Sequence, residues 1–159
     1  QRVDAMSLIH QRLYQTDHIT AIDLPRYVAE LAEGLQAAYG FDTEHFKLEM
    51  DVRQPTLDVE IAIPLGLILN EILTNAFKYA YHDVARPALS IALRPDGAGH
   101  LLLDVADNGP GLGPAARPTG SFGQQMIEVL SEQLGATLHV DSQRGTRYQL
   151  RIPLAAGRP

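Results

Sequence analysis

Four short motifs carry residues whose types and spacing could bind a phosphate, a purine base or a hard metal ion. The first runs from Asn70 to Tyr79 and places Glu71, Asn75 and Lys78 four and three residues apart. On an α-helix these three side chains share one face, with Tyr79 beside it. A carboxylate and an amide oxygen on one face can hold Mg²⁺, and a lysine one turn further can reach a phosphate. A solvated helix face is the alternative interpretation of this motif when it is taken alone.

The second motif, Asp107 to Gly111, reads Asp-Asn-Gly-Pro-Gly and directly follows a predicted strand. A carboxylate at a strand end can accept a hydrogen bond from an exocyclic amine such as that of adenine. Gly109 and Gly111 allow the backbone to approach a flat base closely. Asn-Gly is also a strong turn dipeptide, so a plain tight turn is the alternative for this motif by itself.

The third motif, Gly120 to Gly123, opens a predicted helix, where backbone N–H groups form an anion site. The fourth, Gly145-Thr146, lies between the last two predicted strands. A threonine hydroxyl at that point could support a base-binding carboxylate or a water. Taken singly, the third motif is equally a capped flexible loop and the fourth an ordinary hairpin turn.

The elements that position these motifs follow from hydrophobic periodicity. A long helix with Pro64 near its start carries the first motif, and a loop is expected from Thr16 to Ile22. The other predicted helices cover residues 1–14, 23–39 and 126–134, with Asp23 as a cap and Gly40 and Gly135 as stops. Strands are predicted at 46–52, 57–59, 89–93, 101–105, 138–140 and 148–152.

This order predicts an α+β fold, a two-layer α/β sandwich with a mixed, mostly antiparallel sheet covered by helices on one face. The segment from Asp107 to Gly123 is rich in glycine and proline and has little periodicity. It is long for a passive connection, which favours a functional loop or lid.

Composition narrows the function classes. The 159 residues suit one domain that can bury a core without metal or disulfide support. The absence of cysteine excludes disulfides and thiolate metal sites, and no two of the six histidines lie at metal-ligand spacing on one helix. A formal net charge of −6 argues against a nucleic-acid partner. The longest apolar run, Ile61 to Leu69, contains Pro64 and Gly66 and is too short to span a membrane.

Taken together and in this order, the four motifs resemble the nucleotide site of the ATPase superfamily shared by DNA gyrase, the chaperone Hsp ninety, MutL and the histidine kinases. The resemblance spans residues 60 to 153. The sensor histidine kinases of the HWE-related type are the most similar, through the stretches Ile63 to Glu71, Thr74 to Tyr79 and Ser121 to Gly123. Residues 2–14 resemble the end of that family's second dimerisation helix.

The resemblance implies a Bergerat-type fold that binds ATP and Mg²⁺. Asn75 would ligate the metal, and Glu71 would lie beside the γ-phosphate, where it polarises the nucleophile or positions the metal. Lys78 would contact the phosphates, and Tyr79 would stack near the adenine.

At the base, Asp107 would read the adenine amine and Thr146 would support Asp107. Gly109 and Gly111 would shape the adenine pocket. The lid residues that would close over the phosphates are Ser121, Phe122 and Gly123.

The resemblance also divides the chain into the end of the second dimerisation helix, residues 1–16, and a catalytic ATP-binding domain, residues 17–159. His10 lacks the basic and amide neighbours of a phosphoacceptor, so the accepting histidine is expected upstream of Gln1. The parent protein would homodimerise, phosphorylate its own dimerisation domain and pass the phosphoryl group to the receiver domain of a response regulator. We expect a cytoplasmic location for the chain, with any membrane anchor elsewhere in the parent.

Three alternatives share this nucleotide site. One is a serine protein kinase of the anti-sigma-factor type, against which the N-terminal helix argues. Another is a regulatory module that holds nucleotide without turnover, for which the unusual Gln124 after the lid glycine leaves room. The third is an ATPase that uses Glu71 as a base towards water.

Overall fold

The computed structural model describes residues 20–97, 99–110 and 122–154. Their elements are, in chain order, β1 (Ala21–Asp23), α2 (Leu24–Ala38), β2 (Lys47–Val52), β3 (Thr56–Asp58), α3 (Val59–Asn75), the π-helical turn η1 (Ala76–Ala80), β4 (Ala88–Pro95), β5 (His100–Asp107), α4 (Phe122–Gln133), β6 (Thr137–Asp141) and β7 (Arg147–Pro153). The expectations for the helix over residues 1–14, for His10, and for Gly111 and Ser121 lie outside the described residues.

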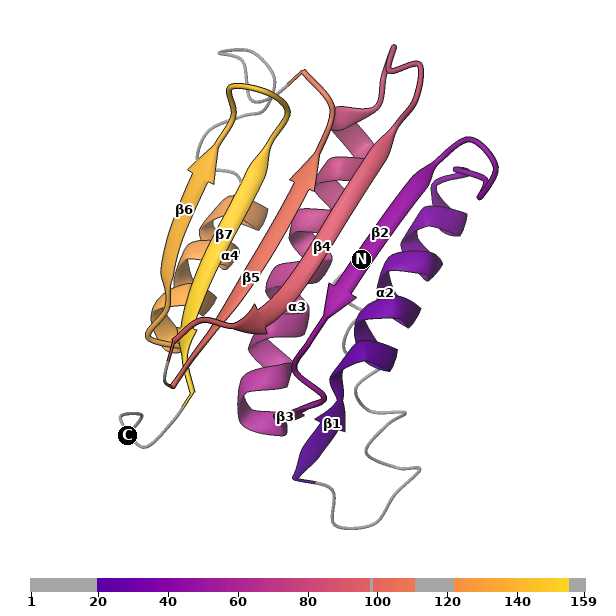
Figure 1. The fold of residues 1–159 in the computed structure, drawn as a ribbon. Coiled ribbons are helices and arrows are strands. Elements are labelled where there is room, and N and C mark those ends of the chain that lie inside the picture. The colour runs from indigo at the N-terminus through magenta and orange to yellow at the C-terminus, as the bar shows by residue number, and fades with distance from the viewer. Residues whose placement is uncertain (1–19, 98, 111–121, 155–159) are drawn as a thin grey trace.

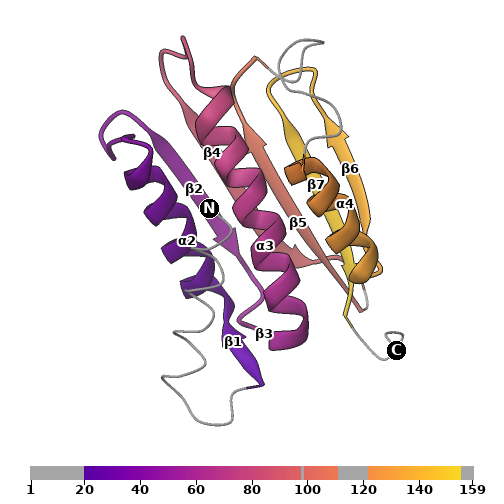
Figure 2. The same cartoon turned by 180° about the vertical axis from the view of Figure 1, so that it is seen from behind.

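The main sheet has five strands in the order β2-β4-β5-β7-β6. The β2–β4 pair is parallel and the other three pairs are antiparallel. The helices α2, α3 and α4 cover one face of this sheet, and the other face carries no helix of the described chain (Figure 1, Figure 2). The predicted two-layer sandwich with a mostly antiparallel sheet is therefore confirmed.

The core forms where alternating apolar side chains of the central strands meet α3. On β5, Leu101, Leu103 and Val105 are buried, as period-two alternation requires. The helix they meet is apolar on nearly all sides. The stretch Val59–Ala80 is long and apolar enough to cross a membrane by length and composition alone, but it lies at the centre of the fold and is mostly buried, as a core helix is.

The ends of α2 follow the sequence signals. The Asp23 side chain accepts a hydrogen bond from the Arg26 N–H at 3.2 Å, and Pro25 lies in the first turn, where its missing N–H costs nothing. Gly40 follows the helix with a φ of +81°, a left-handed conformation that favours glycine.

Two local predictions are wrong near the start of the chain. Ala21 and Ile22 lie in β1 rather than in a loop, because they pair with the short strand β3. Val59 is the first residue of α3 rather than the end of a strand, because Asp58 caps the helix by accepting from the Glu60 N–H at 3.1 Å. Pro64 consequently lies inside α3, where burial of the surrounding apolar residues compensates for the helix bond it cannot donate.

The last turn of the long helix widens. From Ala76 to Ala80 the backbone is π-helical, so side chains after Asn75 no longer follow the α-helical interval. Glu71 is buried, Asn75 is half-buried, and Lys78 and Tyr79 are exposed. Glu71 and Asn75 lie in the α-helix and Lys78 in the π-helical turn, so the three side chains do not share one regular helical face as expected.

A polar cluster lies on the face of the sheet without helices. Asp104 of β5 accepts from Arg147 Nε at 2.9 Å and from a second nitrogen of the same guanidinium. Burial raises the pKa of Asp104, but hydrogen bonds and charge from Arg147 outweigh it, so that the pKa lies below its ordinary value. This bidentate pair links the neighbouring strands β5 and β7.

Candidate functional site

Asp107, the last residue of β5, is the best-defined polar group of the predicted site. Its Oδ1 accepts hydrogen bonds from the backbone N–H of Gly109 at 2.9 Å and of Thr146 at 3.1 Å. The Asp107 N–H in turn donates to the Thr146 carbonyl at 3.0 Å. Within residues 20–97, 99–110 and 122–154, no hydrogen bond reaches Oδ2. One oxygen of this nearly buried carboxylate is therefore fixed, and the other is available to a ligand.

Two glycines allow this arrangement because no side chain would fit. A Cβ on Gly109 would collide with the carbonyl of Ala80, at the end of η1. A Cβ on Gly145 would collide with the Asp107 carbonyl, and its φ of +75° favours glycine independently. The Asp107 turn is thus seated between the end of the long helix and the turn before β7.

The predicted support from Thr146 runs through its backbone. Thr146 is almost fully buried, and its N–H and C=O, rather than its hydroxyl, make the described contacts with Asp107. The sequence suggested a role for the hydroxyl; the backbone contacts could not be predicted, because they depend on the register of β5 against β7.

Tyr81 and Asn108 also belong to the site, and sequence reasoning gave neither a role. The Tyr81 hydroxyl donates to the Ala88 carbonyl at 2.8 Å, and the Ala88 N–H donates to Asn108 Oδ1 at 2.8 Å. Asn108 Nδ2 then donates to the Arg86 carbonyl at 2.8 Å. Burial, and secondarily the Asp107 charge, raise the pKa of Tyr81. These bonds join the segment after η1 to the turn that holds Asp107.

Glu71 meets the N-terminus of α4. Its side chain is buried, and a Cβ on Gly123 would collide with its carboxylate. A negative charge is stabilised at a helix N-terminus by the helix dipole. Phe122, the first residue of α4, is 67% exposed. The first and third motifs are therefore in contact.

Lys78 and Tyr79 are the exposed residues of the first motif. Lys78 Nζ lies 5.4 Å from the centroid of the Tyr79 ring, within range of a cation–π contact. A His82 ring nitrogen lies 2.9 Å from the Lys78 carbonyl and stabilises the end of the widened turn. The described part of the chain holds no group of three or more histidine or acidic side chains that could bind a metal alone. Glu71 and Asn75 offer the oxygen donors that suit Mg²⁺ when phosphate supplies further ligands.

Taken together, the structure brings the described residues of the four motifs to one end of the sheet. Gly109 lies against the end of η1, Gly145 and Thr146 lie against Asp107, and Gly123 lies against Glu71. The arrangement combines a carboxylate with one open oxygen, an exposed lysine and a helix N-terminus. Such a set can bind a base at one side and an anion at the other.

Two family models match the chain. A model described as histidine kinase-, DNA gyrase B- and HSP90-like ATPase matches residues 60–156, more than half of the chain. A model described as histidine kinase matches residues 1–39.

Known proteins are similar over most of the chain. The nitrate/nitrite sensor protein NarQ of Escherichia coli is 34% identical over 118 residues, which cover 73% of the chain and 19% of that protein. The blue-light-activated histidine kinase 2 of Erythrobacter litoralis is 28% identical over 166 aligned positions, which cover 98% of the chain and 46% of that protein. The chain thus spans less than half the length of these two relatives.

The fold has a solved counterpart. The histidine kinase domain of the Erythrobacter litoralis EL346 blue-light-activated histidine kinase superposes with a TM-score of 0.84 at 26% identity. The superposition covers 96% of the chain and 73% of that structure.

Proposed function

Because the chain belongs to the histidine kinase-, DNA gyrase B- and HSP90-like ATPase family, we propose that it is the ATP-binding catalytic domain of a two-component sensor histidine kinase. It transfers the γ-phosphoryl group of ATP to a histidine upstream of this chain in a longer protein. The observation that carries the proposal is the Asp107 carboxylate, with Oδ1 held by two backbone N–H groups and Oδ2 open.

In this proposal Asp107 Oδ2 accepts a hydrogen bond from the exocyclic amine of adenine. Gly109 and Gly111 shape the surface on which the base lies, and Tyr79 stacks near it. Thr146 keeps the carboxylate in place through its backbone, so the acceptor does not have to be reoriented when the base arrives. Burial of Asp107 strengthens a hydrogen bond to the base, because little water competes for the oxygen.

The phosphates extend towards the start of α4. The exposed Lys78 balances their charge, and the N–H groups around Gly123 bind them, with Ser121 and Phe122 closing over them. Asn75 and Glu71 would hold Mg²⁺, which neutralises charge on the phosphate oxygens when bound. Glu71 would polarise the incoming nucleophile or position the metal, and the burial of its carboxylate beside Gly123 supports this role.

We propose that residues 1–16 are the end of a second dimerisation helix and residues 17–159 the catalytic domain. A separate histidine kinase family model matches residues 1–39, which supports a distinct N-terminal segment. That match ends at residue 39, whereas the proposed segment ends at residue 16. The whole protein would form a homodimer in the cytoplasm or at a membrane, phosphorylate its own dimerisation domain and donate to the receiver domain of a response regulator.

The proposal is tested by measuring whether the parent protein phosphorylates itself on histidine. Incubation with Mg²⁺ and γ-labelled ATP should give a label that is stable to base and labile to acid, as a phosphohistidine is. Asn75→Ala and Asp107→Asn should each abolish it. The 159-residue chain alone should bind ATP without labelling itself. An acid-stable label on a serine of a partner would contradict the proposal. So would a label on His10 of the chain alone that survives base and is lost in acid.

A further inference from the structure

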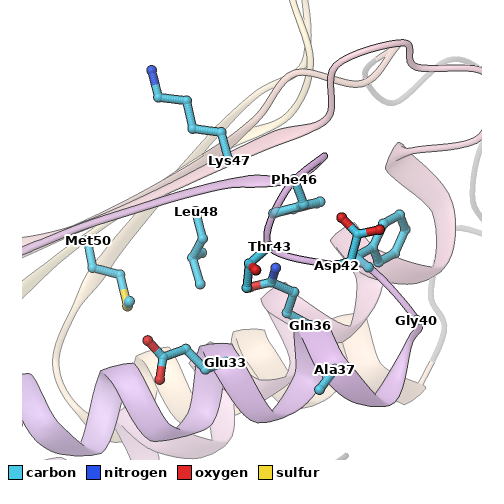
Figure 3. A pocket seen from close by; sticks show the side chains of 11 residues that line it. Glu33, Gln36, Ala37, Gly40, Asp42, Thr43, Phe46, Lys47, Leu48 and Met50 are labelled. Carbon is cyan, nitrogen blue, oxygen red and sulfur yellow. The ribbon is translucent and has the colours of Figure 1, made fainter.

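A pocket lies between α2 and β2, and none of the residues that line it belongs to the four motifs. It has a volume of about 820 Å³, the size of a ligand site, and we call it the α2–β2 pocket. Figure 3 shows Leu48 and Met50 pointing from β2 towards α2, with Glu33 pointing towards them from the helix. Phe41 and Phe46 belong to the same lining.

One polar side chain in this pocket lacks a partner. Gln36 is only 4% exposed, and its carboxamide makes no hydrogen bond with any other part of the chain that the structure describes. It lines the pocket and points into it beside Thr43 (Figure 3). Because this carboxamide faces the pocket, it offers one hydrogen-bond donor group and one acceptor to a ligand that enters.

The neighbouring strand offers further donors. β2 is at the edge of the sheet, and its bonds to β4 begin with the Lys47 N–H and continue to the Arg53 N–H. Because bonds to one neighbour alternate along a strand, the N–H groups of Leu48 and Met50 point away from β4. Such an edge can pair with an extended chain.

The charge of the pocket selects among extended chains. Glu33 and Asp42 are the acidic groups of the lining and both are exposed, although Asp42 also pairs with His45, whose Nδ1 lies 2.9 Å from Asp42 Oδ1. The one lysine of the lining, Lys47, points away from the pocket (Figure 3), and its Nζ lies 3.6 Å from the Glu49 carboxylate. The lining therefore combines apolar side chains with the Gln36 amide, and acidic groups are among its exposed residues.

We propose that the α2–β2 pocket binds an extended, basic peptide segment of a protein partner, which adds to the edge of β2. Its apolar side chains lie against Leu48 and Met50, its backbone or an amide side chain satisfies Gln36, and its basic side chains meet Glu33 and Asp42. This inference is independent of the nucleotide site and holds whether or not the chain binds ATP.

The test titrates the ¹⁵N-labelled chain with acetyl-Lys-Val-Arg-Val-Lys-Val-amide and with its charge-reversed counterpart, acetyl-Glu-Val-Asp-Val-Glu-Val-amide. The basic peptide should saturably shift the amide signals of Leu48 and Met50 and the side-chain signal of Gln36. The acidic peptide should not. Signals of Asp107 and Gly109 should stay unchanged, and Asp107→Asn should leave peptide affinity unaltered, which separates this proposal from the proposed function.

Two variants sharpen the result. Gln36→Leu should weaken binding of the basic peptide about tenfold, as expected for a lost amide hydrogen bond, without lowering the melting temperature of the chain. Glu33→Lys should weaken it as well, whereas Glu132→Lys, the same charge change on α4, should not. Equal binding of both peptides, shifts confined to other surfaces, or binding that Gln36→Leu leaves intact would overturn the proposal. Self-association through β2 without peptide would assign the edge to a second copy of the chain instead.

Discussion

The Asp107 carboxylate accepts a hydrogen bond from the backbone N–H of Thr146 at 3.1 Å, although the two residues lie 39 positions apart in the sequence. The contact depends on the pairing of β5 with β7, which places Ala106 opposite Arg147. Because the sheet itself holds the carboxylate, a ligand meets an acceptor that is already oriented. The same preorganisation makes several parts of the site testable by substitution.

Asn108 is expected to act on nucleotide binding by positioning the Asp107 turn. Asn108→Ala removes both bonds to the segment after η1, which should weaken ATP about tenfold by calorimetry. Asn108→Asp keeps an acceptor for the Ala88 N–H and should lose less. A fall in melting temperature with unchanged ATP affinity would show that Asn108 supports only the fold.

Gly123 is expected to be required because its Cα lies against Glu71. Gly123→Ala should destabilise the chain by about 1–3 kcal/mol, since the added methyl group meets the buried carboxylate. Glu71→Ala removes that carboxylate, so the double variant should recover part of the loss in a double-mutant cycle by denaturant unfolding. Strictly additive effects would mean that the two residues are not in contact in solution.

The crossing of α2 and α3 predicts a contrast between two helical glycines. A Cβ on Gly66 would collide with the Tyr27 hydroxyl, whereas a Cβ on Gly34 meets nothing within 4 Å. Gly66→Ala should therefore cost about 1–3 kcal/mol, and Gly34→Ala should gain about 0.5–1 kcal/mol of unfolding free energy.

The Tyr27 hydroxyl at the same crossing is buried without a hydrogen bond to any described residue. Tyr27→Phe should be neutral or stabilising by roughly 1 kcal/mol, because no partner is lost. It should also relieve part of the Gly66→Ala loss. A marked destabilisation by Tyr27→Phe in thermal unfolding would show that the hydroxyl has a partner in solution.

The Asp104–Arg147 pair predicts a stability that depends on acidity. Because the pKa of Asp104 is lower in the folded chain than in the unfolded one, the pair contributes stability above the unfolded pKa of about 3.9 and loses it as the pH falls through the folded value. In denaturant unfolding, the free energy of unfolding of wild type should exceed that of Asp104→Asn by about 1 kcal/mol at neutral pH. The difference should shrink as the solution is acidified. A difference that grows below pH 4 would contradict this assignment.

Much of the fold and site could be predicted because the signals are local. Alternation identified the central strands, and Asp23 and Gly40 marked the ends of α2. The Asp107 motif, by itself equally a plain turn, was distinguished by its place in the order of the four motifs. The contacts that tie the site together could not be predicted in the same way. The bonds of Tyr81 and Asn108 depend on how the segment before β4 folds back, and the widening at Ala76 interrupts a helical spacing that the sequence itself continues.

The errors have a tertiary origin as well. Ala21 and Ile22 have no strand signal of their own and join β1 only because β3 pairs with them. In the sequence, Gln36 has the signature of an ordinary solvated helix residue. Its burial follows from the fold, which brings Phe41 and Phe46 into the same pocket lining. Whether a polar side chain is solvated or enclosed is decided by segments far from it in the sequence.

The role of Asp107 in adenine binding is tested most directly by calorimetric titration of the wild-type chain and of Asp107→Asn with ATP in the presence of Mg²⁺. Asp104→Asn, a matched loss of charge on the opposite face of β5, serves as the control. Asp107→Asn should weaken ATP binding by at least about tenfold, and Asp104→Asn should leave it unchanged. GTP, which carries a carbonyl in place of the amine, should bind far more weakly than ATP to wild type. Equal ATP affinity of wild type and Asp107→Asn, or equal affinity for ATP and GTP, would contradict this role of Asp107.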